Sequence, residues 1–490
     1  MTTRPFLLRR EVWIVAVLLF ASYAYFYEAG GWNQNSRFAL VRAILEEHTV
    51  RVDSYESATG DKAKWRGHYY SDKAPGTAFL AVVPAGAARI AARAVDVDPA
   101  SRPGIAWTSY VATVFTSGLF SIVAALTLMW IAIEWGATPG AAAFAALGYG
   151  IATPAWAYAT LFMGHAMAAG CLMLAFAAAV ALSSPSTRYR APIAAALGLA
   201  GGWAVVTEFP AAIPLAFIVL LVFVEGSRSS PALATRTTAV VLAGGLVTAA
   251  VLMAYNSAAF GSPFHLGYAS EQGFEQLRVG LFGITYPTLD RLRGILFSAY
   301  RGVIPLAPLT LAAALGLGAL AADRATRRPA VVATGIVIFY LLLNASYYYW
   351  EGGWAYGPRH ITPALPFLFL GLAPLWDRWR GAARWVLVAA CVWGAALGLI
   401  AVSTTAQPPG DVMSPVTELL WPAFRDGDLS LNNQGFADAR ADEGRLRNHL
   451  ELHAGWNLGE LAGFHGRASL IPLGAIWVIG LGGLVRSRQT

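Results

Sequence analysis

Long apolar runs separated by short polar links extend along most of the chain. Each run covers roughly 16 to 30 residues, which is enough for an α-helix to cross the hydrocarbon core of a bilayer. The first run extends from Val12 to about Glu28. The later runs begin near Ile105, Gly140, Met163, Ala191, Pro210, Val240, Gly302, Val331, Ile361, Trp385 and Ala468. The pattern predicts an all-α polytopic membrane protein, a bundle of about twelve transmembrane helices.

The first run is predicted to be a membrane anchor. Arg4, Arg9 and Arg10 precede it, which favours a cytoplasmic N-terminus. A cleaved signal peptide is the alternative interpretation. Aromatic residues at positions 23–27 and the lack of a small-residue cleavage site favour the anchor.

Basic residues set the expected topology. With about twelve spans, the clusters in the short links all fall on one side, as the positive-inside rule requires. These clusters are Arg188/Arg190, Arg228/Arg236, Arg324/Arg327/Arg328, Arg378/Arg380/Arg384 and Arg486/Arg488. The expectation is a multi-pass protein of a bacterial-type inner or plasma membrane, with both termini cytoplasmic.

Residues 75–95 form an apolar segment that needs a different interpretation. The segment contains Arg89 and Arg93, and counting it as a full span would invert every later loop. We therefore predict a helix that lies at the outer membrane surface, or dips in and returns, with its arginines at the headgroups.

The long polar segments are all expected on the extracytoplasmic side of one membrane domain covering residues 1–490. They are a first loop with surface helices at 29–104, a second at 257–301, a short third at 347–360 and a late loop at 403–467. Loops held by a rigid scaffold commonly carry binding and catalytic residues. The chemistry is therefore predicted on this side.

Composition excludes several classes of protein. Apolar residues make up 57% of the chain and charged residues 13%, unlike an ordinary soluble enzyme. The net charge of +7 comes from residues at the ends of apolar runs, so nucleic acid is not an expected partner. Cys171 and Cys391 lie inside apolar runs and have no metal-ligand spacing. No cofactor and no metal site are predicted, although a divalent metal is not excluded.

The first loop holds a group of ionisable residues close to the membrane edge. Asp53 and Asp61 precede the run Gly67-His68-Tyr69-Tyr70-Ser71-Asp72-Lys73-Ala74-Pro75. A solvated polar loop is the alternative for any one of them. Together they indicate a site, because carboxylates and an amine are the groups that general acid–base chemistry and anion binding require.

Two further segments offer cations. Residues 347–360 combine six aromatic residues with three glycines and end in Gly-Pro-Arg-His, so Arg359 and His360 are candidate phosphate ligands. An interfacial aromatic belt is the alternative. Arg301 begins another span, where a snorkelling arginine is an equal explanation. His165 and the lesser candidate Glu208 lie at outer ends of spans.

No glycine-rich phosphate loop, paired Cys/His spacing or serine elbow is present, so a soluble sugar-nucleotide donor is not expected. The chain instead resembles the GT-C class of integral-membrane glycosyltransferases, especially the branch containing protein O-mannosyltransferases and the aminoarabinose transferase of lipid A. The resemblance spans most of the chain and rests on three segments. They are Asn35-Ser36-Arg37-Phe38-Ala39, Tyr69-Tyr70-Ser71-Asp72-Lys73-Ala74-Pro75 and the Gly-Pro-Arg-His segment.

The resemblance implies transfer of a hexosyl or pentosyl group from a polyprenyl-phosphate sugar at the extracytoplasmic face, to a glycan, lipid or protein acceptor. One departure stands out, because Gln34 and Asn35 occupy the place of the family's acidic pair. An amide cannot act as a base. We therefore expect Asp53 as the base, with Asp61 or His165 as substitutes.

The remaining candidates are predicted to bind the substrates. The phosphate ligands are Lys73, Arg359, Arg37, His360 and Arg301. The other substrate-binding residues are Asn33, Gln34, Asn35, Tyr69, Tyr70, Asp72, Trp354 and Tyr356.

Two other functions remain open. A catalytically inactive, lipid-binding relative would explain Gln34 and Asn35. A transporter or flippase would need ionisable residues near the bilayer midplane, and these are nearly absent.

Overall fold

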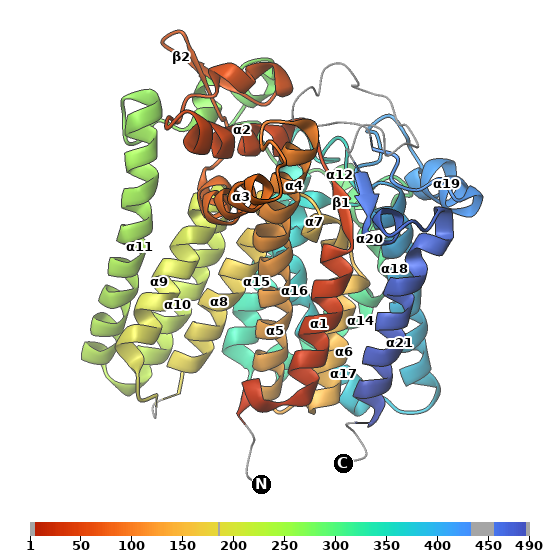
Figure 1. The fold of residues 1–490 in the computed structure, drawn as a ribbon. Helices are drawn as coiled ribbons and strands as arrows, with labels where there is room; N and C mark the ends of the chain where they lie inside the picture. The colour runs from red at the N-terminus through yellow and green to blue at the C-terminus, as the bar shows by residue number, and fades with distance from the viewer. Residues whose placement is uncertain (1–4, 185–186, 433–454, 487–490) are drawn as a thin grey trace.

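A computed structural model describes residues 5–184, 187–432 and 455–486. Helices run roughly side by side in a bundle, and shorter helices and loops cover one end of it (Figure 1). The first helix, α1 (Arg10–Ala24), starts at the uncapped end, and the last, α21 (Ile471–Arg486), finishes there (Figure 1). The described parts of the long polar segments lie at the opposite, capped end (Figure 1).

The bundle consists of apolar helices at the positions of the predicted runs. Nine helical stretches within the described residues are long and apolar enough to cross a membrane, and two more are shorter. The helices of the bundle are α1, α5 (Leu119–Glu134), α6 (Pro139–Ile151), α8 (Gly164–Leu182), α9 (Arg190–Thr207), α10 (Ala212–Ser229), α11 (Pro231–Phe260), α14 (Leu309–Ala322), α15 (Arg327–Ser346), α16 (Leu365–Phe369), α17 (Leu372–Arg378), α18 (Ala382–Thr404) and α21. The chain is an all-α integral membrane protein, and the number twelve stays a prediction.

Two predicted spans are interrupted. The run near Gly302 forms α13 (Val303–Leu306) before α14, and the run near Ile361 forms a 3₁₀ turn at Arg359–Ala364 before α16 and α17. Proline removes a backbone donor, which favours such breaks. At the second break, Gly371 packs on Gly316 so closely that a Cβ on Gly316 would lie 1.8 Å from the carbonyl oxygen of Gly371. Small residues let these two helices approach backbone to backbone.

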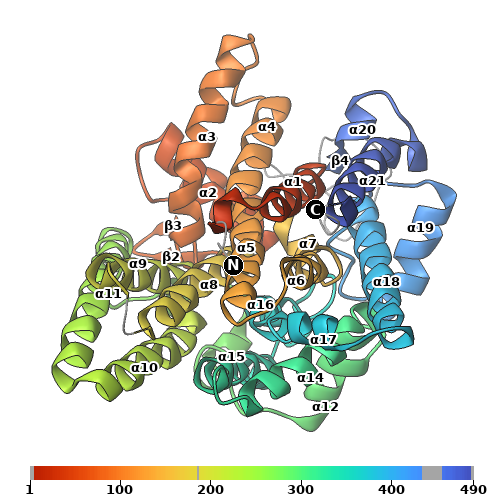
Figure 2. The ribbon, with the colours of Figure 1, turned by 90° about the horizontal axis from the view of Figure 1, so that it is seen from below.

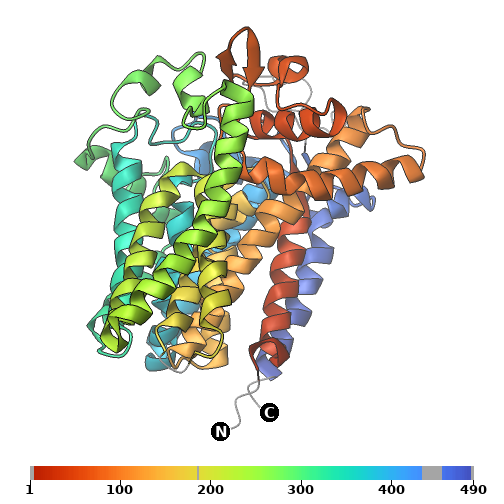
Figure 3. The ribbon, with the colours of Figure 1, turned by 90° about the vertical axis from the view of Figure 1, so that its left-hand side faces the viewer.

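The helix α3 (Gly76–Ala94) lies across the bundle rather than along it (Figures 1 and 3). Its length and composition alone would allow a span. With α4 (Arg102–Thr113) it projects beyond the outline of the other helices when the molecule is viewed from the uncapped end (Figure 2). Arg89 of α3 lies 2.6 Å from the carboxylate of Glu46. The helix thus crosses the bundle direction, and its place at the membrane surface stays a prediction. A π-helical turn at Val114–Gly118 joins α4 to α5.

The cap begins with a short strand, β1 (Phe26–Glu28), which pairs antiparallel with β4 (Gly455–Asn457). The helix α2 (Trp32–Glu46) follows, and a hairpin of β2 (Ala63–Trp65) and β3 (His68–Tyr70) comes before α3. The cap also contains α7 (Ala155–Ala159), α12 (Leu289–Phe297), α19 (Trp421–Asp426) and α20 (Leu458–Leu461). Part of the predicted late loop, residues 433–454, lies outside the described residues.

The strand β1 joins the bundle to the cap through α1. Ser22 on α1 accepts hydrogen bonds from two indoles, that of Trp156 at its carbonyl oxygen (3.1 Å) and that of Trp477 at its hydroxyl (3.0 Å). These contacts fix the end of α1 nearest the cap against α7 and α21. The chain that follows enters the cap at a defined place, where α2 begins directly after the positive-φ glycine Gly31.

Candidate active site at the capped end of the bundle

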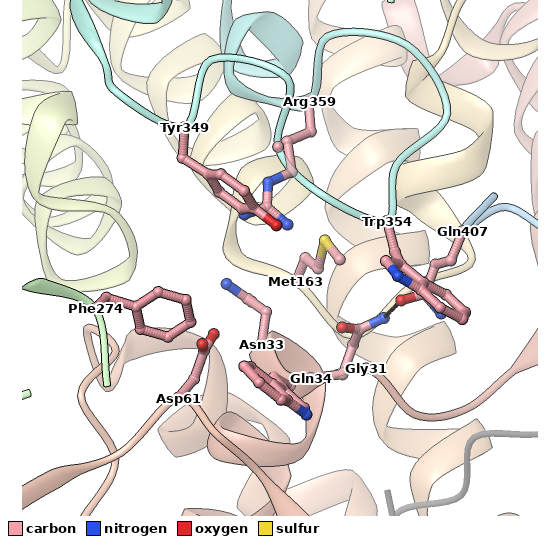
Figure 4. Close-up of a pocket in the computed structure, with 12 residues that line it drawn as sticks. Gly31, Asn33, Gln34, Asp61, Met163, Phe274, Tyr349, Trp354, Arg359 and Gln407 are labelled. Atoms are coloured by element: carbon pink, nitrogen blue, oxygen red, sulfur yellow. Dashed lines mark hydrogen bonds between the residues drawn. The ribbon is translucent and has the colours of Figure 1, made fainter. Parts of the chain in front are cut away.

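A cavity of about 300 Å³ lies between the start of α2, the loop that ends in Gly-Pro-Arg-His and the chain after α18 (Figure 4). Its lining residues are Gly31, Trp32, Asn33, Gln34, Asp61, Met163, Phe274, Tyr349, Gly352, Trp354, Arg359 and Gln407. Arg359 and Tyr349 face Asp61, Asn33 and Gln34 across it (Figure 4). Five of the predicted site residues, Asn33, Gln34, Asp61, Trp354 and Arg359, thus meet around one space.

Lys73 is paired with two carboxylates beside this cavity. Its ammonium nitrogen lies 2.8 Å from Asp61 and 2.7 Å from Asp72, and Asp72 also accepts from the hydroxyl of Ser36 at 3.1 Å. Burial works to lower the pKa of Lys73, but the two carboxylates outweigh it and raise the pKa above its ordinary value. Lys73 is therefore a permanent cation. Burial raises the pKa of Asp72 above its ordinary value, although the charge of Lys73 acts to lower it.

Arg359 makes no ion pair with any described residue, and its Nε is buried without a hydrogen-bond partner. Its guanidinium lies 6.0 Å from the ring centre of Tyr349. Gly352 packs against its aliphatic part, where a Cβ would lie 3.0 Å from Cδ, and the positive φ of +74° also favours glycine there. The glycines of this loop thus let the arginine lie flat against the backbone and extend into the cavity.

Arg37, by contrast, makes a hydrogen bond from each of its three guanidinium nitrogens. It donates to Asn33 Oδ1 at 3.2 Å, to the carbonyl of Ala74 at 3.0 Å and to Glu208 Oε1 at 2.7 Å. Its exposed fraction is only 1%. Arg37 therefore holds α2, the start of α3 and the turn between α9 and α10 together, and it is not among the residues that line the cavity.

His165 and His360 lie next to each other, His165 near Glu208 and His360 beside Arg359. His165 Nδ1 is 3.7 Å from Glu208 Oε1, and the rings of His165 and His360 are 5.5 Å apart. Burial, and then the neighbouring Arg359, lower the pKa of His360 well below its ordinary value. His360 is therefore neutral, and a neutral imidazole offers a phosphate at most one hydrogen bond.

Arg301 is fully buried and donates to three backbone carbonyls. Nε bonds Glu351 at 2.9 Å, and the terminal nitrogens bond Tyr300 at 3.1 Å and Gly353 at 2.6 Å. In this structure Arg301 supports the loop that carries Arg359. It does not line the cavity.

Asp53, the expected base, lies on the hairpin side of the cap and outside the cavity lining. It accepts from the backbone N–H of Tyr69 at 2.6 Å and lies 2.8 Å from Nδ1 of His68, with about two fifths of its side chain exposed. Asp53 and His68 thus close the turn between α2 and β3, while Asp61 occupies the place facing the cavity.

The other predicted substrate residues serve the surrounding structure. Tyr70 packs on Phe260, Asn35 donates to the carbonyl of Ala58 at 2.6 Å, and the carbonyl of Tyr356 accepts from Tyr158. Tyr69 lies over Lys62 and Lys64. Asn35 and Ser36 are residue types that often cap a helix, but α2 begins at Trp32 and both lie inside it.

Several residues of the site were not predicted. Gln407 and Phe274 line the cavity, Glu28 contacts Gln407, and Glu271 lies near the carboxylates of Asp61 and Asp72. Burial, with the charge of Asp72, raises the pKa of Glu271 to about 7. One feature of the sequence could have indicated Glu28, because it is an acidic residue at the end of an apolar run. For Gln407 the sequence held no signal.

No group of three or more His, Cys, Asp or Glu side chains that could hold a metal ion occurs in the part of the chain that the structure describes. The functional groups that line the cavity are one carboxylate, one guanidinium, several amides and aromatic rings. The fold and cavity define a polytopic membrane protein with a charged site at one end of its helical bundle.

The fold is similar to that of ArnT from Cupriavidus metallidurans. The apo structure of ArnT superposes with a TM-score of 0.52 at 16% sequence identity, covering 97% of this chain and 74% of ArnT. ArnT bound to undecaprenyl phosphate gives a TM-score of 0.49 at 18% identity, with coverages of 88% and 67%. The apo oligosaccharyltransferase from Archaeoglobus fulgidus gives 0.48 at 13% identity, with coverages of 81% and 56%. No protein-family model matches the sequence, and no curated protein does. The match to apo ArnT confirms the fold that the resemblance implies.

Proposed function

We propose that the protein is a membrane glycosyltransferase that moves a sugar from a polyprenyl-phosphate donor to a hydroxyl-bearing acceptor. The observation that carries the proposal is the pair of opposed groups in the cavity. Arg359 presents a guanidinium without an ion-pair partner among the described residues, and Asp61 is the only carboxylate among the lining residues. Displacing a phosphate from a sugar needs this combination of a cation and a base.

Arg359 is the proposed ligand of the donor phosphate. A guanidinium binds phosphate oxygens through two parallel hydrogen bonds, and burial strengthens such contacts. Lys73 lies next to the cavity through its contact with Asp61 and adds positive charge on the opposite wall. Trp32, Trp354 and Tyr349 supply flat apolar surfaces on which a sugar ring can stack.

Asp61 is the proposed base, in place of Asp53. The acceptor oxygen forms the new bond to the anomeric carbon and gives its proton to the Asp61 carboxylate. The bond from that carbon to the phosphate oxygen breaks, and the electron pair leaves with the polyprenyl phosphate. Arg359 stabilises the charge that develops on this leaving group.

The capped end of the bundle is the proposed extracytoplasmic side. Arginines gather at the other end, in the links before α9, after α10, before α15 and around α17. This distribution supports cytoplasmic termini through the positive-inside rule. A donor carried by a membrane lipid then reaches the cavity from the outer leaflet.

The experiment that tests the function is native mass spectrometry of the purified protein. Undecaprenyl phosphate is added to the wild type, to Arg359→Ala and to Lys64→Ala, in which an exposed lysine of β2 is removed. We expect the wild type and Lys64→Ala to bind the lipid. Arg359→Ala should bind it at least tenfold more weakly, a difference that corresponds to the loss of one strong charged hydrogen bond. Equal binding by all three proteins would contradict the phosphate site.

Turnover is tested by incubating the protein with a membrane lipid extract and following polyprenyl-phosphate sugars. Their consumption by the wild type, but not by Asp61→Asn, is the expected result. A second candidate function, an inactive lipid-binding protein, is favoured by the amides of Gln34 and Asn35. Bound prenyl lipid that neither protein consumes would support that function instead.

A further inference from the structure

Two buried glutamines connect Glu28 to the wall of the cavity. Glu28 Oε1 accepts a hydrogen bond from Gln407 Nε2 at 3.0 Å, and Gln407 Oε1 accepts one from Gln34 Nε2 at 2.6 Å. The exposed fractions are 7% for Glu28 and 1% for each glutamine. Since the three side chains are shielded from water, the direction of each hydrogen bond is set by the partners alone.

Glu28 sets the direction of the whole chain. Besides Gln407, it accepts from the hydroxyl of Thr405 (2.9 Å), the backbone N–H of Ala406 (2.6 Å) and the amide of Asn432 (2.7 Å). A carboxylate surrounded by donors only accepts. Gln407 must therefore turn its NH₂ towards Glu28 and its carbonyl oxygen towards Gln34. Gln34 must in turn donate its NH₂, which leaves its own carbonyl oxygen for another partner.

The carbonyl oxygen of Gln34 is buried, and the described residues provide no hydrogen-bond partner for it. It points into the cavity, away from the dashed bond to Gln407 (Figure 4). Gly31 closes the other side, since a Cβ there would lie 2.7 Å from this oxygen and 2.6 Å from Gln407 Oε1. An acceptor held without a partner at a cavity wall is a site for a hydrogen-bond donor of a ligand.

We propose that Glu28 is a positioning residue which, through Gln407, holds the carbonyl oxygen of Gln34 in the cavity to accept a hydrogen bond from a substrate hydroxyl. The nature of the substrate rests on the proposed function, whereas the direction of the chain does not. An amide oxygen cannot remove the proton, so Gln34 orients the hydroxyl and Asp61 receives the proton. The hydroxyl belongs either to the donor sugar or to the acceptor.

The direction of the chain is tested by exchanging the carboxylate and the amide. In Glu28→Gln the buried donors lose their acceptor, and in Gln34→Glu a carboxylate faces the carbonyl of Gln407. In the double variant the two hydrogen bonds that link positions 28, 407 and 34 both reverse, and donors face acceptors again along the chain, while the backbone N–H of Ala406 still donates to the amide oxygen that position 28 retains. We expect each single variant to lower the Tm by several degrees and the double variant to recover most of that loss. Additive losses would overturn the proposal.

A second pair of exchanged residues, Glu28 and Gln407, keeps the test independent of whether any one variant folds. Gln407→Glu opposes Glu28 with another carboxylate, whereas Glu28→Gln with Gln407→Glu restores donor to acceptor and leaves Gln34 as in the wild type. Recovery of Tm in this double variant is expected as well. Failure of both double variants to recover overturns the inferred direction.

Ligand binding distinguishes the two sources of the hydroxyl. Undecaprenyl phosphate and undecaprenyl phosphate–glucose are titrated into the wild type and into Gln34→Met, which removes the carbonyl oxygen that faces the cavity without adding a charge beside Arg359. A donor-sugar hydroxyl predicts that the ratio of the two Kd values changes about tenfold while undecaprenyl phosphate binds as before. An acceptor hydroxyl predicts unchanged Kd values and transfer, with a membrane extract as acceptor, slowed about tenfold.

Unchanged binding together with unchanged transfer overturns the assignment of Gln34. If the wild type binds neither lipid, the proposed function fails and the substrate assignment fails with it. The Tm measurements still decide whether Glu28 sets the orientation of Gln34, so the two failures are distinguishable.

Discussion

The guanidinium of Arg37 lies 2.7 Å from the carboxylate of Glu208, which joins the first helix of the cap to the turn between α9 and α10. The exposed fractions of the two side chains are 1% and 14%. Around this pair, Gly164 leaves no room for a Cβ, which would lie 2.1 Å from Glu208 Oε1. The pair therefore holds the cap onto the bundle at one closely packed point, beside His165.

We expect Glu208→Ala to destabilise the protein by about 3–5 kcal/mol, because it leaves the buried Arg37 charge without a counter-ion. Glu225→Ala is the matched control. It removes an ion pair with Arg328 at the uncapped end, where 42% of the arginine side chain is exposed, and we expect a loss of about 0–1 kcal/mol. Chemical unfolding in detergent measures both, and equal losses would contradict the structural role of Arg37.

The fold could be predicted because a bilayer dictates the length of a helix. The runs expected near Met163 and Ala191 begin as helices at Gly164 and Arg190. The breaks near Gly302 and Ile361 could not be predicted in detail. Proline favours both breaks, but the second also brings Gly371 against Gly316 of α14, and nothing local to either residue reports that contact.

The site could be predicted in part for a similar reason. Arg359 and Asp61 were identified by residue type and by their nearness to the membrane, and both line the cavity. The choice between Asp53 and Asp61 depends on how the β2–β3 hairpin turns, which no pattern in the sequence reports. Glu28 and Gln407 come together only because the end of β1 meets the chain that follows α18.

Asp61→Asn is expected to slow sugar transfer by roughly 10²- to 10⁴-fold, because an amide cannot accept the proton of the acceptor hydroxyl. Asp53→Asn is the matched control, since Asp53 carries the same group outside the cavity. The rate of that variant should remain within a few-fold of the wild type. Consumption of polyprenyl-phosphate sugar measures both, and the reverse order of effects would make Asp53 the base.

Arg301→Ala is expected to destabilise the protein by about 3 kcal/mol, because three backbone carbonyls lose their donor inside the protein. Undecaprenyl phosphate should also bind more weakly, because the loop carrying Arg359 loses its support. Arg301→Lys, which keeps the charge but not the planar group, should recover little stability. A variant of normal stability that fails to bind the lipid would place Arg301 in the phosphate site instead.

The carboxyl group of Glu271 predicts a dependence of stability on pH. Its pKa is about 7 in the folded protein and near 4.5 when the chain is unfolded, so the folded state binds the proton more tightly. Its contribution to stability is full below about pH 4.5 and is lost as the pH rises to about 7.

Glu271→Gln removes this titration because the amide stays neutral. The Tm of the variant, relative to the wild type, should therefore rise by a few degrees between pH 5 and pH 8. Glu275→Gln, at a neighbouring exposed position, should show no such rise. Parallel Tm curves for the Glu271 variant and the wild type would contradict the raised pKa.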